Sequence, residues 1–102
     1  MFISGSAPEG GTYVIRPPVR FDLATCQDFQ WVMASAVTFD GCCEIVIDLC
    51  GTEYIDSSAI GMLLLLRERA QKGGKTVALA RAKGAVKCAL EITNLGRIFA
   101  LR

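Results

Sequence analysis

The chain has 102 residues, of which 52% are hydrophobic and 21% are charged, and its formal net charge is +1. This length and composition are typical of one globular domain with one core, so we predict a single domain over residues 1–102. The near-neutral charge argues against duplex nucleic acid as a partner, because such binding needs a basic stripe, and we expect no direct nucleic acid binding. No apolar run approaches the roughly 20 residues that span a bilayer, so we expect no membrane span.

Five cysteines and no histidine narrow the chemistry that the chain supports. The cysteines form no C-x-x-C pair and no zinc-ligand spacing, and their odd, scattered occurrence is typical of a reducing cytosol. The N-terminal "MFISGSAPEGG" lacks a basic start and an apolar run, which predicts no signal peptide. The lack of histidine removes the Ser-His-Asp triad and the commonest metal ligand. We therefore expect a cytoplasmic, non-enzymatic protein without cofactor or metal.

The first third of the chain predicts a strand followed by a helix. Residues 13–16 predict a short strand before Pro17-Pro18, so this strand stops there or lies at a sheet edge. The segment "TCQDFQWVMASAV" has apolar residues at helical spacing, and Thr25 and Asp28 are an expected capping box. Trp31 lies off this apolar stripe, and we expect neighbouring side chains to cover it partly.

The rest of the chain alternates strands and helices. The run "CEIVIDLC" is apolar on both faces except at Asp48, which is typical of a central, parallel strand. Residues 58–72 predict a helix that Gly73-Gly74 ends. A strand in "KTVALA" and a third helix in "KGAVKCALEITNLG" follow, and we expect "RIFALR" to pack back onto the sheet. This alternation predicts an α/β fold with right-handed crossovers.

The segment "YIDSSAIGMLLLLRERAQKGGK", residues 54–75, carries the strongest functional signal. Asp56 or Ser57 is expected to cap the helix. A nucleophilic serine would need a G-x-S-x-G elbow and a base, and both are missing. The "GGKT" that ends this segment resembles part of a Walker A motif, but Arg69 stands where the motif needs glycine. The loop also leads from helix to strand instead of strand to helix.

A phosphate on Ser57 is the remaining interpretation of this segment. A helix N-terminus presents free N–H groups and the positive end of the helix dipole, which favour an anion. Phosphorylation adds about −1.5 to −2 charges, with Asp56 and Asp48 close enough to oppose it. Such a site changes surface charge while the fold stays the same, which suits a binding switch. The apolar residues 62–66 point in every direction around the helix, and we expect most to be buried.

The sequence "IVIDLCGTEYIDSSAIGMLLLLRERAQKGGKTVAL" resembles the central signature of STAS domains, especially bacterial anti-sigma factor antagonists. In that family a buried strand ends in Asp or Asn, and Asp-Ser-Ser or Asp-Ser-Thr follows before an apolar helix with a Gly-Gly stop. "RFDLAT" matches the family's acidic turn, with Asp22 at the acidic position. The resemblance covers residues 22–101 and implies a compact domain with a small mixed β-sheet and helices packed mainly on one face.

The resemblance also implies a partner switch. In the antagonists, the unphosphorylated protein binds a partner that is both serine kinase and anti-sigma factor. Phosphorylation of the first serine of the triplet ends this binding, and a PP2C-type phosphatase restores it. Carried over by position, Ser57 is the phosphoacceptor, in a monomer or weak dimer. The implied partner-binding residues are Asp22, Asp56, Ser57, Ser58, Ala59 and Met62.

Ala59 replaces a glycine that is common in the family, and its methyl group is expected where a kinase approaches. Two other classes of function stay open. Some STAS proteins are constitutive subunits of ABC-type membrane transport complexes, in which the Ser57 surface would dock a transporter ATPase. The third class is a small nucleotide- or ligand-binding module, which GTP or ATP would stabilise against heat.

Overall fold

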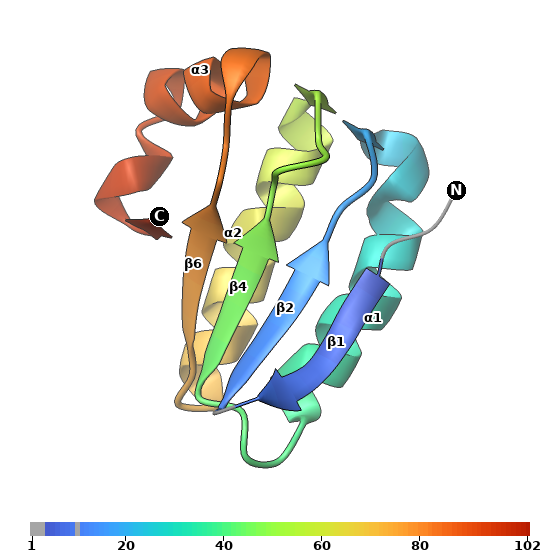
Figure 1. Ribbon diagram of the computed structural model, residues 1–102, viewed down its shortest axis with the longest axis vertical. Helices are drawn as coiled ribbons and strands as arrows, with labels where there is room; N and C mark the ends of the chain where they lie inside the picture. The colour runs from blue at the N-terminus through green and yellow to red at the C-terminus, as the bar shows by residue number, and fades with distance from the viewer. Residues whose placement is uncertain (1–3, 10) are drawn as a thin grey trace.

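A five-stranded mixed sheet forms one layer of the domain (Figure 1). The computed structural model describes residues 4–9 and 11–102, with side chains described from residue 11 onward. The strand order is β1-β2-β4-β6-β7; β1 is antiparallel to β2, and the other neighbours are parallel. The strands are β1 (Ser4–Glu9), β2 (Thr12–Arg16), β4 (Glu44–Asp48), β6 (Thr76–Ala80) and β7 (Ala100–Leu101).

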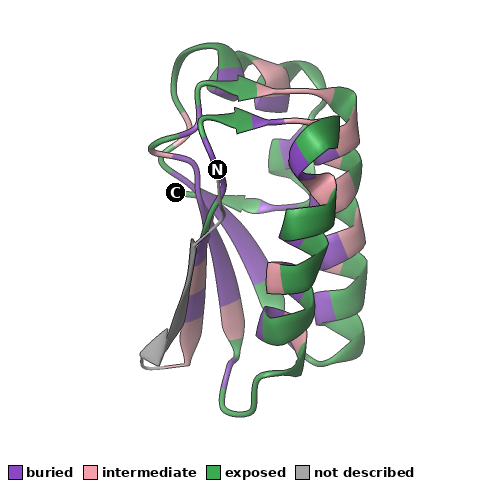
Figure 2. Ribbon diagram, turned by 90° about the vertical axis from the view of Figure 1, so that its right-hand side faces the viewer, coloured by how far each residue is buried: buried purple, intermediate pink, exposed green. Residues whose placement is uncertain are grey.

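Two helices, α1 (Cys26–Thr38) and α2 (Ser57–Lys72), cover one face of this sheet (Figure 2). The shorter α3 (Gly84–Ile92) lies beyond the end of β6, and the one-turn helices η1 (Leu23–Thr25) and η2 (Leu95–Arg97) precede α1 and β7. The expected small mixed sheet with helices mainly on one face is therefore confirmed. Among the described residues, no helix combines the length and apolarity that crossing a membrane requires.

The apolar residues of the central strands explain why these strands are buried. Ile45 and Ile47 of β4 are fully buried in the core under the helices, while Val46 belongs to a smaller cluster on the other face. Because β4 has parallel neighbours on both sides, the prediction of a central parallel strand is confirmed. The terminal segment also packs back as expected, since β7 pairs with β6.

The N-terminal edge of the sheet was missing from the sequence prediction. β2 stops at Arg16, directly before Pro17, as one of the two expected alternatives; it is not an edge strand, because β1 pairs with its outer side. The β1 sequence SGSAPE has no apolar alternation, so only its pairing with β2 reveals it. Gly11 allows the intervening turn, because it adopts a left-handed φ of +85°.

Two expectations about α1 are wrong. Thr25 and Asp28 do not form the capping box; Asp22 accepts from the Ala24 N–H, and the Thr25 hydroxyl accepts from the Asp22 N–H at 3.1 Å. The box therefore starts three residues earlier and encloses η1. Trp31 is 72% exposed, so its neighbours cover little of it.

Candidate functional site

Two very short strands outside the main sheet bring distant segments together. β3 (Arg20–Phe21) and β5 (Tyr54–Ile55) pair in parallel, with Phe21 opposite Ile55. Each strand is followed directly by an aspartate that caps a helix: Asp22 begins η1, and Asp56 begins α2. The Asp56 N–H donates to the Phe21 carbonyl at 3.3 Å, which fixes the two capped turns side by side.

The Asp56 carboxylate serves both turns. Its Oδ1 accepts from the Ala59 N–H at 2.9 Å, which is the N-cap bond of α2. Its Oδ2 accepts from the Leu23 N–H at 3.1 Å. The expectation that Asp56 or Ser57 caps the helix is confirmed for Asp56, and both oxygens of this side chain are engaged.

Asp22 has a matching structural role on the neighbouring turn. Its carboxylate accepts from the Ala24 N–H and lies 3.5 Å from Arg20 Nε. The Arg20 guanidinium also lies over the Tyr54 ring, 4.2 Å from its centroid. The structure therefore brings Asp22 and Asp56 together at one end of the domain, as the family resemblance implies.

Ser57 is the first residue of α2 and lies on the surface. Its hydroxyl is exposed and makes no hydrogen bond to any other described residue. Ser58 is half-buried. The backbone N–H groups at the start of a helix have no intrahelical acceptor, so Ser57 stands at the positive end of the α2 dipole.

Ala59 is not at the surface, which corrects the expectation that it contacts a partner. Its side chain is 0% exposed and belongs to the main core. In the first turn of α2, the direction of each side chain rotates by about 100° per residue, so Ser57 faces solvent while Ala59 faces the sheet. The methyl group at position 59 fills the core and does not obstruct access to Ser57.

The apolar run that follows is mostly buried, as expected. Leu63 and Leu66 are 0% exposed, and Met62 and Leu65 are half-buried against the core. Only Leu64 is largely open to solvent, at 41%. Met62 therefore offers at most part of its side chain to a partner.

Asp48 does not act as a free charge beside Ser57, which corrects a second expectation. Its carboxylate is 6% exposed and accepts two hydrogen bonds from the Arg81 guanidinium, with Arg16 Nε at 3.4 Å. The hydrogen bond from Arg81 lowers the pKa of Asp48 below its usual value, although burial opposes this effect. Its negative charge is thus compensated at the end of β4.

Exposed apolar side chains that the sequence analysis missed surround this site. Leu23 is 72% exposed, and its N–H binds Asp56; Tyr54 is 41% exposed and precedes Asp56 by two residues. Val19 is 55% exposed, and its carbonyl accepts from the N–H groups of Glu53 and Tyr54. The sequence patterns that predict helices and strands do not indicate that these three side chains are exposed.

The Cys26 thiol and the metal-ligating side chains were the other candidates for chemistry. The Cys26 thiol donates to the Asp22 carbonyl at 3.3 Å, and burial, together with the Asp56 and Asp22 carboxylates, raises its pKa, so it stays protonated. Within the described part of the chain, no group of three or more metal-ligating side chains is positioned to hold a metal ion.

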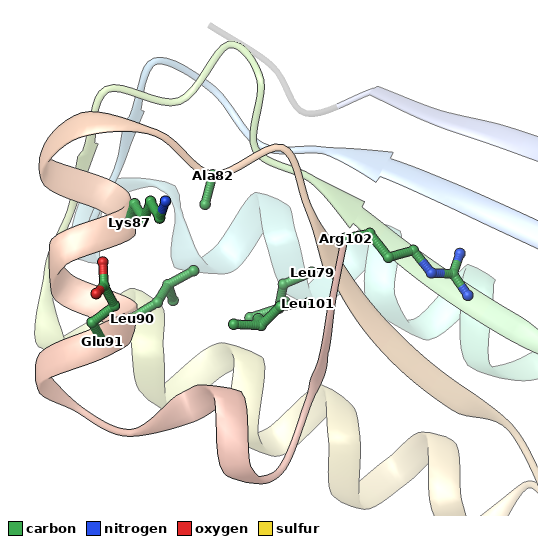
Figure 3. A pocket seen from close by; sticks show the side chains of 7 residues that line it. All are labelled: Leu79, Ala82, Lys87, Leu90, Glu91, Leu101 and Arg102. Atoms are coloured by element: carbon green, nitrogen blue, oxygen red, sulfur yellow. The ribbon is translucent and has the colours of Figure 1, made fainter.

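A cavity of about 220 Å³ lies between α3 and the ends of β6 and β7 (Figure 3). Leu79 and Leu90 form its buried apolar part, and Lys87 and Glu91 of α3 stand at its rim. None of the predicted site residues lines it. The Ser57 site is therefore a surface formed by two capped turns, separate from this cavity.

Known proteins share both the sequence pattern and the fold. The family model for the STAS domain matches residues 8–102. A STAS-domain containing protein of Pseudomonas aeruginosa (strain UCBPP-PA14) is 34% identical over 91 residues, which make up 89% of this chain and 88% of that protein.

Two solved structures show the same fold at low sequence identity. A putative anti-sigma factor antagonist from Thermotoga maritima has a TM-score of 0.84 and 21% identity, covering 97% of this chain and 84% of that one. The Bacillus cell fate determinant SpoIIAA in its phosphorylated form has a TM-score of 0.74 and 15% identity, covering 98% and 90%.

Proposed function

Because the chain belongs to the STAS domain family, we propose that it acts as a non-enzymatic partner switch controlled by phosphorylation of Ser57. With Ser57 free, the protein binds a partner that is both serine kinase and anti-sigma factor. Phosphorylation by that partner ends the binding, and a PP2C-type phosphatase restores it. The similarity of fold to a putative anti-sigma factor antagonist and to the phosphorylated form of SpoIIAA supports this reading.

One observation carries the proposal: the Ser57 side chain is exposed and makes no hydrogen bond to the described residues, while its neighbour Asp56 holds the local structure. The fold does not use the Ser57 hydroxyl, so a phosphate attached to it breaks no hydrogen bond within the described chain. The helix N-terminus also favours an anion at this position. The two states therefore share one fold and differ in surface charge.

The surroundings explain why such a charge would end binding. Leu23 and Tyr54 present exposed apolar area beside the capped turns, and a partner that covers this area excludes water from it. A phosphate of about −1.5 to −2 charges placed in an apolar interface, next to carboxylates, disrupts by desolvation and like-charge repulsion. The Asp22 and Asp56 carboxylates add to that repulsion.

The predicted partner-binding residues then have three different roles: carrying the phosphate, offering contact area, and supporting the local structure. Ser57 carries the phosphate, and Ser58 and Met62 contribute the partly exposed area beside it. Asp22 and Asp56 shape the surface, since their carboxylates hold η1 and the start of α2. Ala59 supports the helix from the core and makes no direct contact.

The test uses a purified candidate serine kinase of the anti-sigma factor type, together with ATP. Intact mass should show one phosphate on the wild type and on Ser58→Ala, the matched control, and none on Ser57→Ala. We expect Ser57→Ala to stay bound to the kinase in the presence of ATP and Ser57→Asp to lose binding. Equal binding of the alanine and aspartate variants would refute the proposal. Co-purification with an ABC-type ATPase, without a phosphopeptide at Ser57, would assign the chain to a transport complex.

A further inference from the structure

Trp31 is the only tryptophan of the chain and is 72% exposed on the outer side of α1. The opposite side of the same helix is anchored in the core by Phe29, Met33 and Ala36, which are each 0% exposed. Trp31 therefore adds nothing to the core that α1 completes without it. A single exposed apolar residue needs no explanation, so its surroundings decide whether it has a role.

Uncharged side chains line a shallow hollow beside Trp31, and the exposed Asp28 lies three residues before Trp31 on the same helix. Gln27, Gln30 and Ala34 line this hollow with Trp31, and its volume is about 270 Å³. Together with Leu23, which lies four residues before Gln27, these residues make up what we call the α1 outer surface. Apolar and amide side chains of this kind adapt well to a protein partner, and tryptophan is enriched among the residues that dominate binding energy.

The α1 outer surface is continuous with the Ser57 site. Its first member, Leu23, is 72% exposed, and its N–H donates to the Asp56 carboxylate at 3.1 Å. The same carboxylate caps the helix whose first residue is Ser57. Leu23 thus lies at the turn beside Ser57, and the exposed residues Gln27 and Trp31 follow it along the chain at intervals of four residues.

We propose that the α1 outer surface is the anchoring half of the interface with the serine-kinase partner, with Trp31 inserted into an apolar pocket of the kinase. This inference rests on the proposed function of Ser57. A kinase must hold its substrate beside the acceptor hydroxyl, and the surface that starts at Leu23 is where it would do so. A second copy of this chain bound there would cover Leu23 and obstruct the same approach.

The chemistry of the two halves differs, and this sets the expected kinetics. Gln27, Gln30 and Ala34, which line the hollow with Trp31, are uncharged, so a phosphate on Ser57 acts mainly on the half of the interface near Leu23. Trp31 binds the kinase but does not contact the reacting atoms. Its loss should therefore raise KM for phosphorylation and leave kcat unchanged.

The first experiment measures phosphorylation of Trp31→Ala, Trp31→Phe and Ile92→Ala by the same candidate serine kinase. Ile92 is the matched control, because it is 81% exposed on α3, away from α1. We expect Trp31→Ala to raise KM about 30-fold, the effect of truncating a central aromatic residue, with kcat within about twofold. Trp31→Phe should recover most of this loss, and Ile92→Ala should change KM less than about twofold.

A second experiment observes the surface directly. With 5-fluorotryptophan incorporated, the wild-type chain gives a single ¹⁹F resonance from Trp31, and we expect it to shift when unlabelled kinase is added. An unshifted resonance with unchanged KM, while Ser57 is still phosphorylated, would overturn this inference alone. Absence of any kinase binding would overturn it together with the proposed function. A shift that depends only on the concentration of the protein itself would assign the surface to a second copy instead.

Discussion

Leu23 and Asp56 are 33 residues apart in the chain and are joined by a hydrogen bond of 3.1 Å from the Leu23 N–H to Asp56 Oδ2. The other oxygen of the same carboxylate accepts from the Ala59 N–H. One side chain therefore fixes the start of α2 and ties it to η1. The aspartate beside Ser57 thus has a structural role that is independent of any phosphate.

This arrangement predicts that Asp56→Ala lowers the free energy of unfolding by about 1–2 kcal/mol, because it removes an N-cap. Asp56→Asn keeps one carbonyl oxygen as an acceptor and should cost about 1 kcal/mol, the value of one hydrogen bond. Urea unfolding measures both. Faster amide exchange at Leu23 or Ala59 would identify which bond the asparagine variant has lost. Asp40→Ala, on an exposed turn, serves as the control, and Asp56→Ala with wild-type stability would contradict the assignment.

The burial of Ala59 predicts that restoring the common family glycine does not help the kinase. Ala59→Gly should leave the phosphorylation rate of Ser57 within about twofold and lower the free energy of unfolding by about 1 kcal/mol, because glycine is a poor helix former. Thermal unfolding and kinase assays measure the two effects. A large rise in phosphorylation would show that the methyl group at position 59 does obstruct access.

Gly61 provides the opposite case on the exposed side of α2. A Cβ placed there meets no atom within 4 Å, and its position four residues after Ser57 puts it on the same helix face. Gly61→Ala should therefore raise the free energy of unfolding by about 0.5–1 kcal/mol. Since the added methyl group lies on the same helix face as Ser57, one turn further along α2, we expect it to hinder the approach of the kinase and raise KM. Unchanged KM would place the kinase contact elsewhere on the helix.

Lys75, the lysine of the "GGKT" sequence, has a structural role. Its side chain is buried, and Nζ donates to the Val37 carbonyl at 2.7 Å and the Phe39 carbonyl at 2.9 Å, at the C-terminal end of α1. Lys75→Met keeps the apolar stem and removes both bonds, so we expect a loss of about 1–3 kcal/mol in urea unfolding. Lys72→Met, on the exposed end of α2, is the matched control and should change stability by less than about 0.5 kcal/mol. If both variants unfold at the wild-type urea concentration, Lys75 does not stabilise the end of α1.

The parts of the fold that the sequence predicts are those with strong local patterns. Continuous apolar runs predict β4 and β6, and the apolar residues around Leu63 together with Gly73-Gly74 predict α2 and its end. These elements would bury the same residues in almost any packing of the chain. The position of Asp22 near Asp56 was also predictable, but only from the family resemblance, because no local pattern relates the two.

The parts that sequence patterns missed depend on pairing between distant segments. β1 has no apolar alternation, and β3 and β5 contain two residues each, so only their partners define them. The same holds for Asp48, whose neighbours are Arg16, the last residue of β2, and Arg81, the residue directly after β6. The sequence places a charge at the end of β4 but does not say which cations will compensate it.

The compensation of Asp48 predicts how stability depends on pH. The Arg81 hydrogen bond lowers the pKa of Asp48 in the folded protein, whereas in the unfolded chain this carboxyl titrates near about 3.9. The unfolded state therefore binds the proton more readily at low pH. The stabilising contribution is complete above about pH 4 and is lost as the pH falls through the lower folded value.

Asp48→Asn removes this titration while keeping the size of the side chain. We expect the variant to be less stable than the wild type at pH 7, and we expect the difference in urea midpoint to shrink as the pH falls below about 4. Asp40→Asn makes the same charge change on an exposed turn and should show no such convergence. A difference between Asp48→Asn and the wild type that stays constant down to pH 2.5 would mean that the ion pair with Arg81 does not lower the pKa of Asp48 in the folded protein.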